Sequence, residues 1–320
     1  MKIHKTLPKN FKDDLYFKKY DEFLWSGDVL DLLNKLPKEP LFDLVVTSPP
    51  YNIGKSYENN KSLKEYFAMQ KEVIELTDRL VKNSGSICWQ VGNHIDKKKE
   101  SIYPLDFGFH EIFSNLGYTL KNRIIWKFGH GMHAKKRLSG RYETILWYVK
   151  SQDYTFNLDS IRVPSKYEGK TYYKGPNKGK VSSSSKGKNP EDVWDIPNVK
   201  GNHVEKTIHP CQFPVGLIER LVLGMSNPKD VVFDPYMGVG SAGIASIIHD
   251  RKFIGADKDN DYVKIAKERL SDLKKGKLKY RSHKTPIYDH ESSGLSYVGL
   301  KKQYDQLKDK YQQLKDDLNV

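Results

Sequence analysis

The sequence predicts an α/β fold in which a mostly parallel sheet carries helices on both faces. Short apolar runs that contain β-branched residues recur along the chain, and segments with apolar residues at helical spacing separate several of them. Two of these runs end in unusual turns, one with consecutive prolines at 48–51 and one rich in glycine at 234–241. Ligands of open α/β sheets bind at the carboxyl ends of the strands, so the two turns mark the predicted site.

In the first half of the chain, apolar spacing predicts regular elements from residue 29 onward. Residues 1–26 are polar and aromatic and show no clear period. Asp28 precedes a short predicted helix and is a suitable N-cap for it. We expect helices at 29–37, 63–82 and 105–117, and strands at 41–46, 86–91, 122–128 and 142–149. The polar segment 93–101 is predicted to be a solvated loop.

The second half begins with a segment of different composition and then returns to the same alternation. Residues 150–205 are rich in Tyr, Lys, Gly, Ser and Pro, and 178–189 has the composition of a flexible linker or mobile loop. Beyond them we expect a helix after Pro214 and another at 242–248, with strands at 231–233 and 252–256. These changes divide the chain into a first half at 1–149, an insert at 150–205, a second half at 206–275, and a basic tail with a helix at 276–320.

The C-terminal tail contains a heptad pattern. Its apolar residues alternate spacings of four and three, namely Leu300, Tyr304, Leu307, Tyr311, Leu314 and Leu318. About three heptads are marginal for an isolated coiled coil. The predicted helix therefore either packs on the body of its own chain or pairs with a second copy in a homodimer.

Composition limits the classes of protein to which the chain can belong. Of its 320 residues, 38% are hydrophobic, which is enough for a sizeable core. No apolar run is long enough to span a membrane, and the first residues lack the apolar stretch of a signal peptide. Cys88 and Cys211 form neither a disulfide framework nor a typical zinc site. We expect a reduced, cytoplasmic protein with no membrane partner and no metal ion.

The charge balance indicates a polyanionic partner. Lys and Arg number 54 against 40 acidic residues, which gives a net charge of +14. Nucleic acid is the simplest partner for such a surplus, and a solubilising lysine-rich surface is the alternative. In segment 129–141, His130 and His133 lack acidic or cysteine companions and do not indicate zinc. Candidate phosphate contacts, which could also be exposed loop residues, are Lys135, Lys136, Arg137 and Arg141 in that segment, and Lys166, Lys170 and Lys174 among tyrosines of the insert.

The Pro-Pro turn is suited to bind a planar ring that carries an amino group. Ser48, Pro49, Pro50 and Tyr51 follow a predicted buried strand, and the two prolines cannot donate to a sheet. They fix an extended turn that presents carbonyl oxygens and the Ser48 hydroxyl at constant positions. These oxygens can accept N–H bonds from an amino group while Tyr51 stacks on the ring. By itself, such a turn is also common between a strand and a loop.

The glycine-rich turn indicates a nucleotide-like ligand. It joins a predicted strand to a predicted helix, and Gly238, Gly240 and Gly243 match the glycine spacing of dinucleotide-binding folds. A nicotinamide-dependent dehydrogenase is therefore one alternative. Asp234 argues against it, because a carboxylate at the start of the turn would face a cationic amino group and would repel a pyrophosphate. Asp257, at the end of the next strand, can accept both hydroxyls of a ribose in either case.

Together these stretches resemble the DNA amino-methyltransferases in which the catalytic motif precedes the cofactor motif. This is the N(4)-cytosine and N(6)-adenine methyltransferase family, whose best-known members are the methylases of restriction–modification systems. The resemblance covers roughly residues 25–270. Its four parts, in the family's order, are the catalytic motif at Thr47 to Asn52, the segment beside the methionine part of the cofactor at His209 to Pro214, the D-P-F-x-G-x-G-T loop at Asp234 to Ser241, and the ribose-binding acid at Asp257.

The cofactor loop departs from the family's pattern at two positions. Tyr236 stands for the usual Phe of the family's loop, and Ser241 stands for the usual Thr. The order of the motifs excludes the protein-glutamine methyltransferases, whose Pro-Pro-Tyr motif follows the glycine loop. The resemblance assigns catalysis to Ser48, Pro49, Pro50 and Tyr51, and cofactor binding to Asp28, Thr47, His209, Phe213, Asp234, Pro235, Gly238, Gly240, Ser241 and Asp257.

The resemblance also implies a fold and partners. We expect a Rossmann-like, S-adenosylmethionine-dependent methyltransferase fold with a mostly parallel, seven-stranded sheet, a catalytic half at 1–149 and a cofactor half at 206–275. The insert at 150–205 would recognise the target, and the tail would add a C-terminal helix. The expected partners are double-stranded DNA and, encoded separately, a cognate restriction endonuclease.

The expected reaction transfers a methyl group from S-adenosylmethionine to the exocyclic amino group of a flipped base. Ser48 favours cytosine N(4), since Ser is commoner at this position in the cytosine enzymes of the family and Asp in the adenine enzymes. Adenine N(6) is the alternative. A catalytically silent DNA-binding module would explain the charge alone, and the dehydrogenase would explain only the glycine turn.

Overall fold

The computed structural model describes residues 2–8, 20–52, 61–96, 101–129, 131, 133–165, 167, 169–182, 184–285 and 297–317. The chain forms two compact units, a body at Met1–His283 and a C-terminal unit at Lys284–Val320. Within the described ranges, no helix has both the length and the apolar character needed to cross a membrane.

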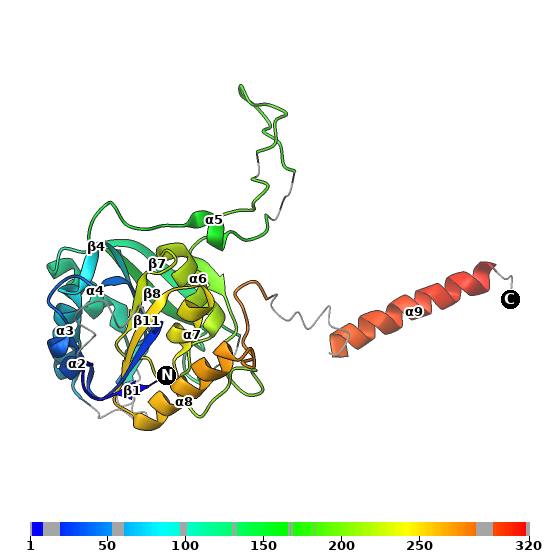
Figure 1. Cartoon of the computed structure of the whole chain (residues 1–320). Coiled ribbons are helices and arrows are strands. Elements are labelled where there is room, and N and C mark those ends of the chain that lie inside the picture. Colours follow the sequence, from blue (N-terminus) through cyan, green and yellow to red (C-terminus); the bar gives the residue numbers. More distant parts are fainter. Residues whose placement is uncertain are drawn as a thin grey trace. The chain divides into compact units, whose positions relative to one another are not determined.

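The body is built on one nine-stranded sheet, seen nearly edge-on in Figure 1. Its strand order is β1-β2-β11-β10-β3-β4-β8-β7-β9. The first six strands of this order are parallel, β8 is antiparallel to both of its neighbours, and β9 is parallel to β7. The strands are β1 (Ile3–His4), β2 (Glu22–Ser26), β3 (Phe42–Thr47), β4 (Val81–Val91), β7 (Thr119–Lys127), β8 (Tyr142–Val149), β9 (Val193–Asp195), β10 (Val231–Asp234) and β11 (Lys252–Asp257).

The sheet differs from the expected seven strands at its edges. The additional strands are short edge pieces, since β1 has two residues and β9 has three, too few for a recognisable pattern. Strand β2 was also not predicted, because all five of its residues are buried and no alternation remains. The loop predicted at 93–101 is wrong in part, since β5 (Asn93–Asp96) pairs with β6 (Ser101–Pro104) as a hairpin.

Helices cover both faces of the sheet, as predicted (Figure 1). Consecutive strand residues point to opposite faces, so Val45 belongs to the core cluster that includes residues of α2, α3 and α4. Leu44 and Val46 belong to the cluster that includes residues of α6, α7 and α8. The helix α8 was not predicted. The helices of the body are α2 (Val29–Lys35), α3 (Leu63–Asp78), α4 (Leu105–Asn115), α5 (Leu158–Ile161), α6 (Val215–Met225), α7 (Ser241–Ile248) and α8 (Asn260–Lys274).

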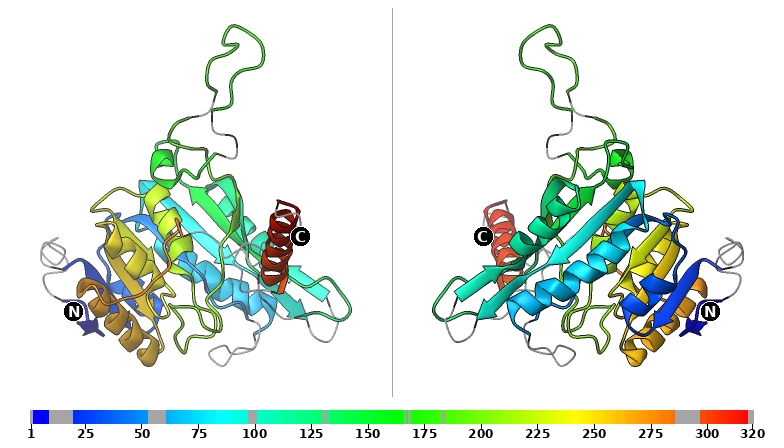
Figure 2. Two further views of the ribbon diagram at one scale, coloured as in Figure 1. Left: turned by 90° about the vertical axis from the view of Figure 1, so that its right-hand side faces the viewer. Right: turned by 90° about the vertical axis from the view of Figure 1, so that its left-hand side faces the viewer.

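The insert leaves the body as a two-stranded arm, which both views of Figure 2 show projecting from the sheet. At its base, Val163 and Lys188 exchange backbone hydrogen bonds of 3.0 and 2.9 Å. All described residues between 167 and 186 are exposed. The chain then returns to the sheet as β9, next to β7.

The C-terminal unit contains α9 (Tyr297–Asp317), which confirms the predicted helix. Four residues of the heptad pattern, Tyr304, Leu307, Tyr311 and Leu314, are 52–67% exposed. The helix thus carries an apolar stripe along its length.

Candidate active site

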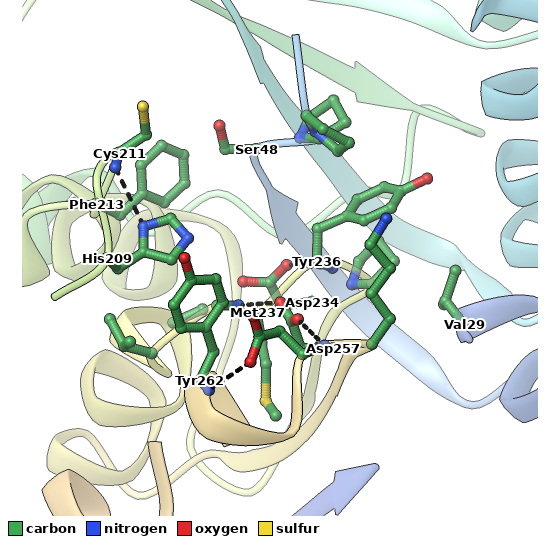
Figure 3. Close-up of a pocket in the computed structure, with 18 of the residues that line it drawn as sticks. Val29, Ser48, His209, Cys211, Phe213, Asp234, Tyr236, Met237, Asp257 and Tyr262 are labelled. Carbon is green, nitrogen blue, oxygen red and sulfur yellow. Dashed lines mark hydrogen bonds between the residues drawn. The ribbon is translucent and has the colours of Figure 1, made fainter. Parts of the chain in front are cut away.

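A cavity of about 240 Å³ opens at the carboxyl ends of the parallel strands β2, β3, β10 and β11 (Figure 3). The turns after these strands form its walls, because parallel neighbours end at the same edge of a sheet. Thr47 and Gly240 are not among the lining residues. The predicted catalytic and cofactor residues that line it are Asp28, Ser48, Pro49, Pro50, Tyr51, His209, Phe213, Asp234, Pro235, Gly238, Ser241 and Asp257.

Asp234 is a buried acid between the two predicted turns. It ends β10 and is 3% exposed. Its Oδ1 atom accepts hydrogen bonds from Thr47 Oγ1 at 2.6 Å and from the Tyr236 backbone N–H at 3.0 Å. Burial, with a smaller contribution from the Asp257 carboxylate, raises the pKa of Asp234 to about 7. A cation inside the cavity would favour the ionised form.

Asp257 ends β11 and holds the glycine-rich turn beside it. Its Oδ2 atom accepts the Gly238 N–H at 2.9 Å, and its Oδ1 atom accepts the Asp259 N–H at 2.8 Å. Burial raises the pKa of Asp257 to about 6, although both hydrogen bonds favour the charged form. Each carboxylate oxygen has two lone pairs, so the group can accept further bonds from two ligand hydroxyls.

Two glycines of the turn have left-handed backbone conformations for different reasons. Gly238 has φ +49°, and a Cβ atom there would lie 3.2 Å from His209 Nε2 in the cavity wall. Gly240 has φ +77°, and its Cβ atom would come within 2.8 Å of Ala266 Cβ. The structure therefore gives Gly240 a packing role between α7 and α8, whereas Gly238 lies at the cavity itself.

His209 forms a neutral part of the cavity wall, facing Tyr262 (Figure 3). Its Nδ1 atom accepts the Cys211 N–H at 3.2 Å, and its ring centroid is 4.5 Å from that of Tyr262. Burial and the positive charge of Lys206 lower the pKa of His209 to about 4. The imidazole is therefore uncharged near neutral pH.

Buried polar contacts fasten the His209 segment to α6 and α7. Ser241 Oγ, in the first turn of α7, donates to the Phe213 carbonyl at 2.8 Å. Glu205 is 3% exposed and accepts the Val215 N–H at the start of α6 at 2.9 Å. Ser241 lines the cavity, but its hydroxyl proton is directed to the protein backbone.

Asp28 lies at the start of α2 and lines the cavity from that side. Its Oδ1 atom accepts the Leu30 N–H at 2.9 Å, which confirms the predicted N-cap. The preceding Gly27 N–H donates to the Asp257 carbonyl at 3.0 Å. This bond places the start of α2 beside the end of β11.

Ser48 and Tyr51 belong to a polar group that we call the Tyr51 network, consisting of Ser48, Tyr51, Gln90 and Glu143. Tyr51 Oη lies 3.0 Å from Ser48 Oγ, 2.5 Å from Gln90 Oε1 on β4 and 3.2 Å from Glu143 Oε2 on β8. Gln90 Nε2 also donates to Glu143 Oε2. Burial raises the pKa values of Tyr51 and Glu143 above their usual ranges.

Sequence reasoning missed several residues of this site. Gln90 and Glu143 reach the Pro-Pro turn from β4 and β8, too far along the chain for a local motif to indicate them. Tyr262 belongs to α8, a helix that was not predicted. Met69 and Val73 line the cavity from α3, which was predicted as a helix but not as part of the site.

The predicted phosphate contacts lie on two surface segments outside the cavity lining. Lys166 lies outside the described residues. Glu143 follows Arg141 by two residues, so the first basic segment adjoins the Tyr51 network. The described residues, all exposed or partly exposed, are Lys135, Lys136, Arg137 and Arg141 between β7 and β8, and Lys170 and Lys174 on the arm.

Comparison with known proteins identifies the family. The N6/N4 methyltransferase family, described as DNA methylase, matches residues 42–268. The Type II methyltransferase M.BglII of Bacillus subtilis is 47% identical over 248 residues, which are 78% of this chain and 68% of that protein. The DNA adenine methyltransferase YhdJ of Escherichia coli K12 is 35% identical, over 76% of this chain and 81% of that protein.

Solved structures have the same fold. The PvuII DNA methyltransferase, described as cytosine-N4-specific, aligns with a TM-score of 0.62 at 19% identity, over 82% of this chain and 94% of that one. M1.HpyAVI in complex with S-adenosylmethionine aligns with a TM-score of 0.54 at 22% identity, over 78% of this chain and 98% of that one.

The chain therefore belongs to the N6/N4 DNA methylase family and is an S-adenosylmethionine-dependent DNA amino-methyltransferase. The solved structures confirm the Rossmann-like fold, and membership of the family confirms the cofactor implied by the sequence. Membership of this family excludes the dehydrogenase alternative.

Proposed function

We propose that the protein methylates cytosine N(4) at specific sites of double-stranded DNA, as the modification enzyme of a cytoplasmic restriction–modification system. The observation that carries the choice of cytosine is Ser48, which stands at the first position of the catalytic motif and lines the cavity. Serine at this position is commoner among the cytosine enzymes of the family.

The carboxylates of the cavity fit the charge and hydroxyls of S-adenosylmethionine. Asp234 would hold the ammonium of the methionine part, and Asp257 would accept the ribose hydroxyls. His209 and Phe213 would flank the methionine part. The raised pKa of Asp234 supports this assignment, because an ammonium beside it offsets the cost of its buried charge. When bound, the cofactor supplies a methyl group on a sulfonium leaving group.

Other residues would support the cofactor site through the protein. Thr47 orients Asp234 by its hydrogen bond, and Gly240 allows the turn to pack on α8. Asp28 presents the capped start of α2 to the cavity. The cavity wall between these groups is formed by Pro235, Gly238 and Ser241.

The target base would enter the same cavity after leaving the duplex. Its amino nitrogen is a poor nucleophile, because the lone pair is delocalised into the ring. Ser48 Oγ and the Pro49 carbonyl would accept its two N–H bonds and stabilise the positive charge that develops on the nitrogen. Tyr51 would stack on the base, and Pro50 would keep the turn extended. In-line placement against the methyl group supplies much of the remaining rate.

The exposed basic residues would bind the phosphates of the duplex. Arg141 is two residues from Glu143 of the Tyr51 network, so the segment that holds Lys135, Lys136, Arg137 and Arg141 would bind DNA close to the target base. Lys166, Lys170 and Lys174 would bind along the arm. Exposed Tyr172 and Tyr173 on the same arm can add stacking or base-edge contacts.

N(6)-adenine is the second candidate target. YhdJ, which is 35% identical to this chain, is named for adenine, whereas the structurally similar PvuII enzyme is described as specific for cytosine N4. A hydroxyl at position 48 can accept an N–H bond from either amino group. The two bases are therefore distinguished by the product.

Nucleoside mass spectrometry tests the proposal. Plasmid DNA of diverse sequence is incubated with the protein and S-adenosylmethionine and then digested to nucleosides. We expect N(4)-methylcytosine. N(6)-methyladenine would keep the mechanism and overturn the choice of base, and the absence of both would favour a catalytically silent DNA-binding module.

We further propose that α9 pairs two copies of the chain through its apolar stripe and that a separately encoded endonuclease shares the recognition site. The exposed Tyr304, Leu307, Tyr311 and Leu314 support the first statement. Truncation after residue 295 should halve the mass in solution, measured by light scattering. An unchanged mass would refute pairing through this helix.

A further inference from the structure

The Tyr51 network gives the catalytic turn a direction of hydrogen bonding. Tyr51 Oη lies 3.0 Å from Ser48 Oγ and 2.5 Å from Gln90 Oε1, and Gln90 Nε2 donates to Glu143. An ionised carboxylate can only accept hydrogen bonds, whereas a hydroxyl and an amide can do both. Glu143 at the end of this chain of bonds therefore determines which way the other groups point.

The donor and acceptor of each hydrogen bond in the network can be assigned in turn, starting from Glu143. Because Glu143 accepts from Gln90 Nε2, the Gln90 amide presents its oxygen to Tyr51. Tyr51 then donates its single proton to Gln90 or to Glu143, and its oxygen is left to accept the proton of Ser48. The Ser48 oxygen keeps its lone pairs for a group in the cavity that it lines.

We propose, building on the proposed role of Ser48 in binding the target amino group, that Glu143 and Gln90 are positioning residues that hold the Ser48 hydroxyl as a hydrogen-bond acceptor. Neither residue lines the cavity, so both act through Tyr51. With Glu143 protonated, every bond of the chain can reverse. Ser48 would then accept from Tyr51 and direct its own proton toward the amino N–H groups.

Several neighbouring groups favour the charged form of Glu143. Tyr51 and Gln90 bond to it from the turn after β3 and from β4, Lys200 contributes positive charge from the segment after β9, and Trp126 lies opposite on β7. Desolvation nevertheless raises the pKa of Glu143. Ionisation is therefore lost as the pH falls through this raised pKa, and turnover should fall with it.

A single substitution removes the charge and keeps the shape. Glu143→Gln should lower kcat by about 10- to 100-fold, because an amide accepts or donates and no longer fixes the chain. The KM values for DNA and for S-adenosylmethionine should stay within about twofold. The exposed Glu111→Gln on α4 is the matched control and should leave kcat unchanged.

An exchange of the two side chains separates direction from packing. In Gln90→Glu combined with Glu143→Gln, a carboxylate again accepts from Tyr51, now directly at position 90. This double variant should recover kcat to within about fivefold of the wild type. In a Tyr51→Phe background, which lacks the hydroxyl, Glu143→Gln should cause no further decrease in kcat.

These measurements distinguish a failure of the proposed function from a failure of the positioning role. Absence of methyl transfer by the wild-type protein would overturn the proposed function itself. A wild-type protein that transfers methyl groups, together with a folded Glu143→Gln variant of normal kcat, would overturn only the positioning role. The positioning role would also be overturned by an exchange variant that binds the cofactor normally without recovering kcat. It would be overturned as well if kcat at saturating cofactor fell with decreasing pH in the same way in Glu143→Gln as in the wild type.

Discussion

Thr47 and Asp234 lie 187 residues apart in the chain, and Thr47 Oγ1 donates a 2.6 Å hydrogen bond to Asp234 Oδ1. Thr47 belongs to the catalytic motif and Asp234 to the cofactor motif. Both residues are buried, at 0% and 3% exposure. The bond therefore couples the position of the proposed catalytic turn to the charge state of the proposed cofactor site.

Thr47→Val should weaken cofactor binding at neutral pH. Valine has a similar shape but no hydroxyl, so the ionised form of Asp234 loses a hydrogen bond and its pKa rises above the value of about 7. We expect affinity for S-adenosylmethionine to fall about 5- to 30-fold at pH 7, measured by titration calorimetry. Thr47→Ser keeps the donor and should bind normally. A loss that is equally large at pH 9, where Asp234 is ionised in both proteins, would contradict this explanation.

Asp234→Asn should stabilise the free protein while removing cofactor binding. Burial raises the pKa of Asp234 from 3.8 to about 7, so the native state keeps a proton that the unfolded chain releases. Stability contributed by this residue therefore falls as the pH rises from about 4 to 7. At pH 8 we expect the Asn variant to be more stable by on the order of 1–3 kcal/mol, measured by urea unfolding. Equal stabilisation at pH 4 and pH 8 would show that ionisation is not the cause.

Gly240→Ala should destabilise the protein more than a glycine substitution that causes backbone strain alone. Gly240 combines φ +77° with a 2.8 Å approach of the added Cβ atom to Ala266. Gly117→Ala is the matched control, because φ is +83° there and nothing lies within 4 Å. We expect the free energy of unfolding to fall by about 1 kcal/mol in the control and by about 3 kcal/mol in Gly240→Ala, measured by thermal unfolding. Ala266→Gly should restore part of the difference, and a failure to do so would place the strain elsewhere.

Removal of positive charge from the arm should weaken DNA binding without affecting the cofactor. Lys170→Gln with Lys174→Gln should lower affinity for duplex DNA, because each phosphate contact contributes about 0.9 to the slope of log affinity against log salt. Fluorescence anisotropy over a salt series measures this slope, and Lys267→Gln with Lys275→Gln on and beside α8 provides the charge-matched control. Equal slopes for the two double variants would exclude the arm from phosphate binding.

The turns at the ends of β3 and β10 were predictable because each carries its signal within a few consecutive residues. Prolines directly after an apolar run, and glycines before a helical one, are recognisable from the chain alone. The N-cap role of Asp28 was equally local. The sheet then brings the proposed cofactor and catalytic residues of these turns around one cavity.

The parts that were missed depend on contacts between distant segments. Gln90 and Glu143 contact each other and Tyr51 only because β4 and β8 are neighbours in the sheet. Strand β2 has no alternating pattern because both of its faces are covered. The hydroxyl of Ser241 has the residue type expected for a ligand contact, and only the fold directs it to Phe213.

The paired backbone bonds between Val163 and Lys188 bring the two ends of the arm together at a single point of the body. A segment whose ends are adjacent can be replaced by another of different length without moving the sheet that supports it. Recombination at this junction would supply a new arm to an unchanged catalytic body. With the DNA contacts proposed for the arm, exchange of this one segment would change sequence preference while the chemistry of the body is inherited intact.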